Sequence, residues 1–183
     1  GLVWDSSGSG AARDHAREFA LLDAYFRRMG NGTVRLVRLR DAAEPVQTFR
    51  ITGGTWHELR RALETTAYDG ATNLGAFPSA GDVGEYLLFS DGLSNFGEAA
   101  LPATTAPVFA IAAAARIDAG ALRRIAQRGT GRFIDLMADT APEAARALLE
   151  SSTRITSLEG SGLTRLVAAS PRSEEHTSEL QSL

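Results

Sequence analysis

The chain has 183 residues, of which 44% are hydrophobic and 22% are charged, and this composition is typical of a globular domain rather than of a disordered segment. The formal net charge is −3 and all 19 basic residues are arginine, so the charge gives no electrostatic case for binding nucleic acid. Cysteine is absent, which excludes disulfides, thiolate metal sites and cysteine nucleophiles. No run of about 18 apolar residues occurs, so we expect no membrane span within this chain.

The first third of the chain alternates strand and helix signals. A short apolar run at residues 2–4 predicts a strand, and apolar residues then recur at spacings of three and four between His15 and Met29, which predicts an amphipathic helix. Gly30 should end that helix because glycine accepts the left-handed conformation of a helix terminus. Strands are predicted at 34–39 and 46–51, close enough in sequence to form a hairpin.

The remaining elements are marked by capping residues and continuous apolar runs. Thr55 and Glu58 form a capping box that predicts a helix to about residue 66, Asp118 should cap a helix at 119–128, and Thr140 with Glu143 should open a helix that ends near residue 150. The apolar runs at 86–89 and 108–115 predict strands buried on both faces, and a further strand is predicted at 132–137.

This alternation predicts an α/β fold with one antiparallel edge strand in an otherwise parallel sheet. The pattern covers residues 1–150, whose start inside a strand indicates a truncated N-terminus. Residues 151–171 are interpreted as a linker or the start of a further β segment. Residues 172–183 resemble the translation of a common sequencing-library adapter, and we interpret them as an artefactual tail, with an ordinary polar tail as the alternative.

Three polar loops follow or precede strands at positions where α/β proteins bind ligands. The first has the pattern D-x-S-x-S from Asp5 to Ser9, the second contains Thr72, and the third is Ser90-Asp91-Gly92. Together they offer carboxylates and hydroxyls but no thiolate or imidazole. Such an all-oxygen set suits a hard divalent cation, Mg²⁺ first and then Mn²⁺ or Ca²⁺.

The order D-x-S-x-S, G-x-T-N and S-D-G over about 90 residues resembles the von Willebrand factor type A (vWA) domain and its metal-ion-dependent adhesion site (MIDAS). The resemblance implies a Rossmann-like, doubly wound, six-stranded sheet of order 3-2-1-4-5-6, with strand 3 antiparallel at the edge and helices on both faces. Strands 1 and 4 are then neighbours at the switch point where a ligand is expected. The sequence from residues 1–5 onward also resembles that of bacterial proteins that join this domain to a vault/inter-alpha-trypsin (VIT) domain.

The resemblance assigns roles to five residues. Ser7, Ser9 and Thr72 are the expected metal-touching hydroxyls, whereas Asp5 and Asp91 are expected to reach the ion more often through water and to hold the hydroxyls in place. Neutral hydroxyls leave the cation electron-poor, so an open coordination position should attract a carboxylate from another protein.

Two glycines of the first loop are expected to shape the backbone of this site. Gly8 and Gly10 are expected to let the backbone turn sharply around the ion. Gly10 stands where the family often has a larger residue such as Met, which leaves the local packing open.

The implied function is a Mg²⁺-dependent protein-binding module that recruits an exposed Glu or Asp of a partner protein, with a location in the cell envelope or outside the cytoplasm. The alternative is a regulatory or assembly subunit of an ATPase or metal-insertion complex. An enzyme is not expected, because His15 and His57 lie far from the three loops in sequence and no general base is paired with a nucleophile.

Other interpretations of single residues remain beside these. The glycines at 8 and 10 could form a dinucleotide loop, and Asp5 could be a phosphatase nucleophile, although Ser7 stands where a second Asp would be needed. Ser90 is expected to support Asp91.

Side chains elsewhere are expected to be structural. His15 should pack on the apolar face of its helix, His57 should face solvent, and Trp4 and Trp56 should lie in or near the core. The arginines of the 34–39 strand and its end, Arg35, Arg38 and Arg40, are interpreted as a solvated strand face, with a partner-binding patch as the alternative.

Overall fold

The computed structural model describes residues 1–77, 82–94, 104–128 and 131–150. Strands and helices alternate along the chain in the order β1 (Leu2–Asp5), η1 (Gly8–Ala12), α1 (His15–Met29), β2 (Gly32–Leu39), β3 (Gln47–Ile51), α2 (His57–Glu64), η2 (Leu74–Ala76), β4 (Tyr86–Phe89), β5 (Val108–Ala112), α3 (Ala119–Arg128), β6 (Phe133–Asp135) and α4 (Ala141–Glu150).

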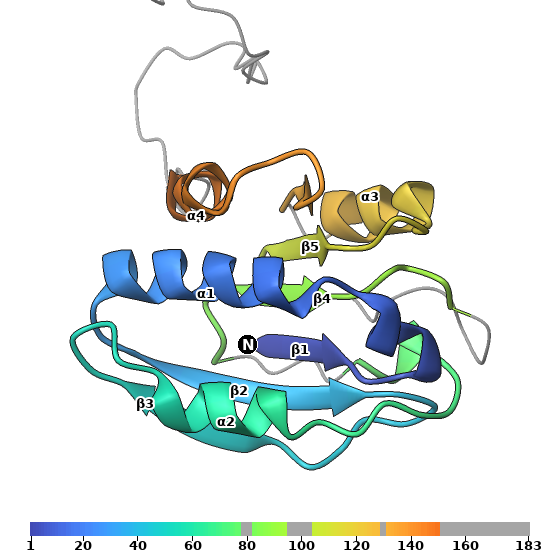
Figure 1. The fold of residues 1–183 in the computed structure, drawn as a ribbon, viewed down its shortest axis with the longest axis horizontal. Helices are drawn as coiled ribbons and strands as arrows, with labels where there is room; N and C mark the ends of the chain where they lie inside the picture. Colours follow the sequence, from blue (N-terminus) through green and yellow to red (C-terminus); the bar gives the residue numbers. More distant parts are fainter. Residues whose placement is uncertain (78–81, 95–103, 129–130, 151–183) are drawn as a thin grey trace, which may run out of the picture. The chain divides into compact units, whose positions relative to one another are not determined.

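The strands form one six-stranded sheet of order β3-β2-β1-β4-β5-β6 (Figure 1). β1 runs parallel to both β2 and β4, so the direction in which strands are added reverses at β1. β2 and β3 form an antiparallel hairpin at one edge, and the remaining pairs are parallel. The predicted fold class and strand order are therefore confirmed.

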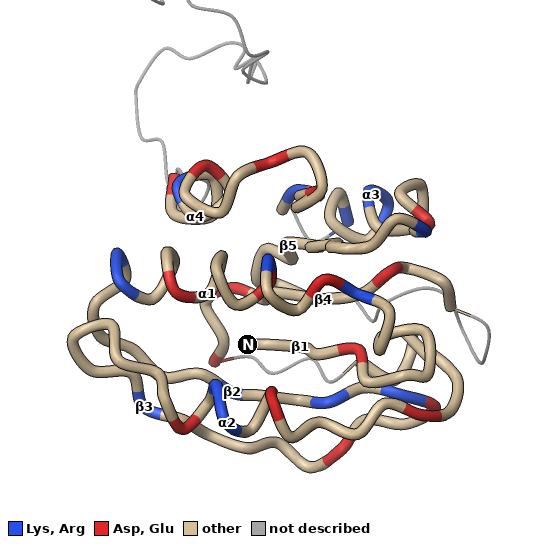
Figure 2. The backbone as a smooth tube through the Cα atoms, viewed as in Figure 1, with Lys and Arg blue, Asp and Glu red and all other residues tan. Residues whose placement is uncertain are grey.

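The two faces of the sheet are separated by the alternation of side chains along each strand. Leu2 and Trp4 of β1 belong to a core with α1, α2 and α4, whereas Val3, between them, belongs to a core that includes Ile125 of α3. β4 and β5 are buried along their whole length and carry no charged residue (Figure 2). Burial on both faces explains why these two strands read as continuous apolar runs.

Large aromatic side chains fill the first core. Trp4 is fully buried and Trp56 is nearly so, as predicted. Trp4 lies 5.1 Å from Phe89 of β4, measured between ring centroids, and Phe26 of α1 lies 5.5 Å from Trp56 at the start of α2. α1 packs along α4 on this face. Trp4 therefore packs β1 against β4 one residue before β1 ends at Asp5.

The helix caps agree only in part with the sequence. Asp118 Oδ1 accepts the Ala121 amide at 2.8 Å, which confirms the predicted cap of α3. At α4 the carboxylate of Glu143 accepts hydrogen bonds from both the amide and the hydroxyl of Thr140. Of the two bonds of the predicted capping box, the one from the Thr140 amide to Glu143 is therefore present. The box predicted at Thr55 is wrong, because the backbone of Thr55 closes a turn onto Thr52 and α2 starts two residues later without a side-chain cap.

No helix in the described ranges is both long and apolar enough to cross a membrane. The interpretations of residues 151–171 and 172–183 concern a part of the chain that lies outside the described residues.

Candidate metal centre

The three polar loops meet at the carboxyl edge of the sheet, where β1 and β4 end side by side. Asp5 closes β1, and Ser90 and Asp91 directly follow β4. Asp5, Ser7, Thr72, Ser90 and Asp91 are each no more than 2% exposed. A buried set of polar side chains needs partners, because an unpaired polar group inside a protein is costly.

The carboxylate of Asp5 is held from two sides. Its Oδ1 accepts the Ser7 amide at 3.0 Å, and its Oδ2 accepts the Ser90 hydroxyl at 2.6 Å. The Ser90 hydroxyl in turn accepts the Gly92 amide at 3.0 Å. Ser90 therefore bonds across Asp91 to the Gly92 amide, and it also ties the end of β4 to Asp5, because adjacent parallel strands place Ser90 beside that carboxylate.

The first loop also brings two predicted ligands together. The hydroxyls of Ser7 and Ser9 lie 3.3 Å apart, and Ser9 is exposed whereas Ser7 is buried. Either hydroxyl can donate to the other, and this hydrogen bond places two of the oxygens that the D-x-S-x-S motif predicts as ligands side by side.

The second loop is docked on the first by backbone bonds. The Gly8 amide donates to the Gly70 carbonyl at 3.1 Å, and the Asp69 amide donates to the Ser6 carbonyl at 3.2 Å. The Thr72 carbonyl accepts the Ser94 hydroxyl at 3.1 Å, which links the second loop to the third. Thr72 is thus placed between the loops that carry Asp5 and Asp91.

The third loop is fixed onto α3. Asp91 Oδ1 accepts the Leu93 amide at 2.9 Å, while its carbonyl accepts the Asp118 amide at 2.8 Å. Gly92 has φ +74, and a Cβ there would lie 2.8 Å from Leu122 Cγ. Only glycine satisfies both conditions, so Gly92 lets Asp91 sit this close to the helix.

The glycines of the first loop act differently from the prediction. Gly8 and Gly10 do not have positive φ; the described loops of the site use that conformation at Gly70 and Gly92. Gly10 is needed for close packing instead, because a Cβ there would lie 2.7 Å from the Asp5 carbonyl oxygen and 2.8 Å from Arg13 Nη1. The space that a larger residue would fill is occupied by the Arg13 side chain.

The residues present fit a small hard cation. The donors that converge are carboxylate and hydroxyl oxygens, and the described residues hold no cluster of three His, Asp or Glu side chains that would bind a metal in another way. Asp5 is already fixed by two donors, so it is suited to orient ligands and to balance charge. Ser9 is exposed, so it lies on the open side of the site.

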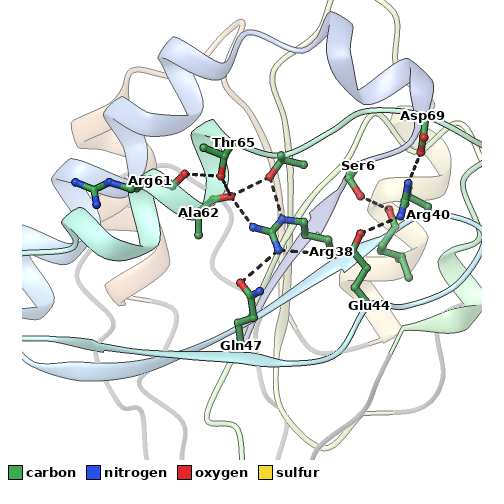
Figure 3. A network of polar contacts seen from close by, with 11 residues as sticks. Ser6, Arg38, Arg40, Glu44, Gln47, Arg61, Ala62, Thr65 and Asp69 are labelled. Atoms are coloured by element: carbon green, nitrogen blue, oxygen red, sulfur yellow. Dashed lines mark hydrogen bonds and ion pairs between the residues drawn. The ribbon is translucent and has the colours of Figure 1, made fainter.

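Arg38 of β2 and Arg40, which directly follows β2, do not form a freely solvated face (Figure 3). Arg38 donates to the Ala62 carbonyl at 2.6 Å and to the Thr66 hydroxyl at 3.0 Å, so it closes the end of α2. Arg40 pairs with Asp69 of the second loop and with Glu44, and its hydrogen bond to Asp69 raises its pKa. The solvated-face interpretation is therefore wrong for these two side chains: Arg38 is bound to the end of α2, and Arg40 is bound to the second loop.

The Arg35 side chain and His57 are exposed, whereas His15 is packed against other side chains. Arg35 pairs with Asp82 in an exposed position, and His57 is exposed as predicted. His15 packs on Tyr68 with ring centroids 5.0 Å apart, and its Nδ1 lies 2.7 Å from a Glu18 carboxylate oxygen. The packing was predicted; the bond to Glu18 was not.

Solved structures with the same arrangement of elements show which fold this is. The chain is similar to an aerotolerance-related membrane protein from Bacteroides fragilis that carries multiple mutations to serine, with a TM-score of 0.60 and 16% identity over 82% of this chain and 95% of that one. It is similar to a von Willebrand factor type A protein from Catenulispora acidiphila, with a TM-score of 0.50 and 19% identity over 82% of this chain and 41% of that one. The fold is that of a vWA domain.

A third vWA-like neighbour is the conserved hypothetical protein BatB from Bacteroides thetaiotaomicron, with a TM-score of 0.53 and 16% identity over 82% of this chain and 93% of that one. No family model and no curated protein sequence matches the chain. The likeness at these identities is one of fold, so the metal site rests on the residues of this chain.

Proposed function

We propose that this vWA fold is a protein-interaction module that holds Mg²⁺ at the three loops and uses it to bind a carboxylate of a partner protein. The observation that supports this most strongly is the convergence of Asp5, Ser7 and Ser90 through direct hydrogen bonds, next to the loop that carries Thr72. These residues come from both sides of the switch point of the sheet, which is where α/β sheets bind ligands.

The charges of the site favour a cation. Asp5 and Asp91 are both buried, and two ionised carboxylates at one edge of a sheet repel each other unless positive charge lies between them. In this proposal Ser7, Ser9 and Thr72 supply neutral hydroxyl ligands, and the two aspartates hold the loops and balance the charge. When bound, Mg²⁺ supplies an electron-poor coordination position that takes a carboxylate oxygen.

The same charges explain why partner binding should depend on metal. Without a cation, Asp5 and Asp91 present negative charge to an incoming Glu or Asp and repel it. With a cation the contact becomes attractive, so the dependence should be steep. We further propose binding rather than catalysis, because the hydrogen bonds of Asp5 and Asp91 go to groups that position them, the Ser90 hydroxyl included, and within the described residues no histidine bonds to either carboxylate.

Location is a further proposal. The Bacteroides fragilis neighbour is described as a membrane protein, and a cell-envelope location for this chain would agree with that description. Fluorescence microscopy of the tagged full-length protein in its native host would test it.

The metal site is tested by titrating the full chain with Mn²⁺, whose free-ion electron paramagnetic resonance signal disappears on binding. We expect one site, competition by Mg²⁺, and a loss of affinity of tenfold or more in Thr72→Ala and Ser9→Ala. Ser6→Ala is the matched control, because Ser6 belongs to the same loop but, among the described residues, its hydroxyl bonds to the Leu39 carbonyl alone. Equal Mn²⁺ affinity in the control and in both variants would show that Thr72 and Ser9 are not ligands of the metal.

A further inference from the structure

Arg13 is a fully buried cation directly behind the candidate metal centre. Its Nη1 donates to the carbonyl of Asp5 at 2.6 Å, and its Nε donates to a carboxylate oxygen of Glu18 at 2.8 Å. Both side chains of the Arg13–Glu18 pair are 0% exposed. One guanidinium therefore joins the last residue of β1 to α1.

Two aromatic rings lie beside this cation, one from β1 and one from the segment before the second loop. The guanidinium carbon lies 5.0 Å from the ring centroid of Trp4 and 6.0 Å from that of Tyr68. The Trp4 indole N–H donates to the Tyr68 hydroxyl at 2.8 Å, and Tyr68 immediately precedes Asp69 of the second loop. Arg13 thus touches the residues that lead into two of the three loops of the site.

The chain is shaped to admit this side chain. Gly10 leaves room that a Cβ would fill, since that atom would lie 2.8 Å from Arg13 Nη1. Glu18 is anchored in turn by His15, whose Nδ1 lies 2.7 Å from the second carboxylate oxygen. The guanidinium is consequently held at three points: Asp5, Glu18 and the ring of Trp4.

A gain in folding stability is not a sufficient explanation for the buried Arg13–Glu18 pair. Burying two charges often costs more than their attraction returns, and an apolar pair of similar volume is frequently as stable or more so. Arg13 Nη2 is buried and has no partner in the described part of the chain, which adds to the cost. The bond that an apolar pair could not replace is the one from Nη1 to Asp5.

We propose that Arg13 is a positioning residue for the metal centre, which fixes the backbone of Asp5 and thereby the geometry of the D-x-S-x-S loop. This inference rests on the proposed function. The planar fork of the guanidinium is required, because two different nitrogens serve Glu18 and Asp5 at the same time.

Arg13→Lys tests this requirement in the full chain. Lysine keeps the charge beside Glu18 but lacks the fork, so the variant should remain folded while the bond to Asp5 is lost. The loss of one hydrogen bond of ordinary strength predicts a three- to tenfold weaker Mn²⁺ affinity. Arg17→Lys is the matched control, because Arg17 likewise bonds to a carboxylate, that of Asp14, and to a backbone carbonyl, that of Leu136, and both partners lie outside the three loops; its affinity should stay within twofold of the wild type.

A second readout needs no metal. The Ser7 amide donates to Asp5 Oδ1, so its hydrogen-exchange rate in the metal-free protein reports how firmly Asp5 is held. We expect exchange at Ser7 to be at least threefold faster in Arg13→Lys, and in Arg13→Met/Glu18→Met if the lysine variant fails to fold. Unchanged Ser7 exchange together with unchanged Mn²⁺ affinity in a folded variant would overturn the proposal.

The two proposals can fail separately. If the wild type does not bind Mn²⁺, the proposed metal-dependent function fails, and the Ser7 exchange rates still decide whether Arg13 positions Asp5. If the wild type binds Mn²⁺ and the Arg13 variants bind it equally well, the metal site stands and the positioning role is overturned.

Discussion

Replacing Ser90 by alanine removes a hydroxyl that makes two buried hydrogen bonds at the centre of the site. The hydroxyl donates to Asp5 Oδ2 at 2.6 Å and accepts the Gly92 amide at 3.0 Å, and Ser90 is 0% exposed. The variant removes a single oxygen atom and keeps the rest of the side chain. Its effect therefore measures how strongly β4 is tied to β1 through side chains.

The expected loss of stability follows from the two groups left without a partner. A buried donor or acceptor that loses its hydrogen bond costs about 1–3 kcal/mol, and Ser90→Ala leaves two such groups, Asp5 Oδ2 and the Gly92 amide. Ser90→Ala should lower the free energy of unfolding by about 3 kcal/mol. Ser6→Ala is the control: Ser6 is equally buried but makes one long bond of 3.4 Å, so it should cost less than about 1 kcal/mol.

Urea unfolding of the full chain in EDTA, followed by tryptophan fluorescence, measures this difference without metal. With a slope of about 1–3 kcal/mol per molar urea, a difference of about 2 kcal/mol moves the midpoint by roughly 1 M. Equal midpoints for Ser90→Ala and Ser6→Ala would refute the inference that Ser90 carries the link between the two strands.

Two further predictions concern glycine conformation and alkaline stability. Gly92→Ala should cost about 3 kcal/mol in urea unfolding, since a positive φ costs about 1–2 kcal/mol and the new Cβ would lie 2.8 Å from Leu122; Gly53→Ala, at φ +57 with open space around it, should show only the conformational cost. Burial and the neighbouring Glu85 raise the pKa of Tyr25, so the folded protein holds the phenol proton more tightly than the unfolded chain. This stability is complete below the unfolded pKa of about 10 and is lost as the pH rises above it, so urea midpoints between pH 9 and pH 11 should fall more in the wild type than in Tyr25→Phe.

The sheet could be predicted from the sequence because its signals are local. Continuous apolar runs mark β4 and β5, alternation and spacing mark β2 and β3, and the motif residues sit at strand ends, where parallel topology gathers them. The strand order itself came from the family resemblance, and the structure has the same order. The assignment of Asp5, Ser7, Ser9, Thr72 and Asp91 as metal ligands stays a prediction, although the structure brings their loops together.

Contacts between residues far apart in sequence could not be predicted. Ser90 and Asp5 are 85 positions apart, and only the pairing of β1 with β4 places them together. The sequence pattern predicts that Arg38 is an exposed strand residue, yet its long side chain reaches the end of α2. The sequence contains one signal for the buried position of Arg13. The unusual glycine at position 10 leaves space that a nearby large side chain must fill.

The central claim is that the cation held by these loops presents an open position to a carboxylate. Water-proton relaxation of the Mn²⁺-loaded full chain measures it directly, because a ligand that displaces metal-bound water lowers the relaxation enhancement. We predict that a short peptide with a central glutamate lowers the enhancement and that the same peptide with glutamine does not. If the enhancement is the same with both peptides, or if the wild-type chain binds no Mn²⁺, the account of a metal-dependent interaction module is contradicted.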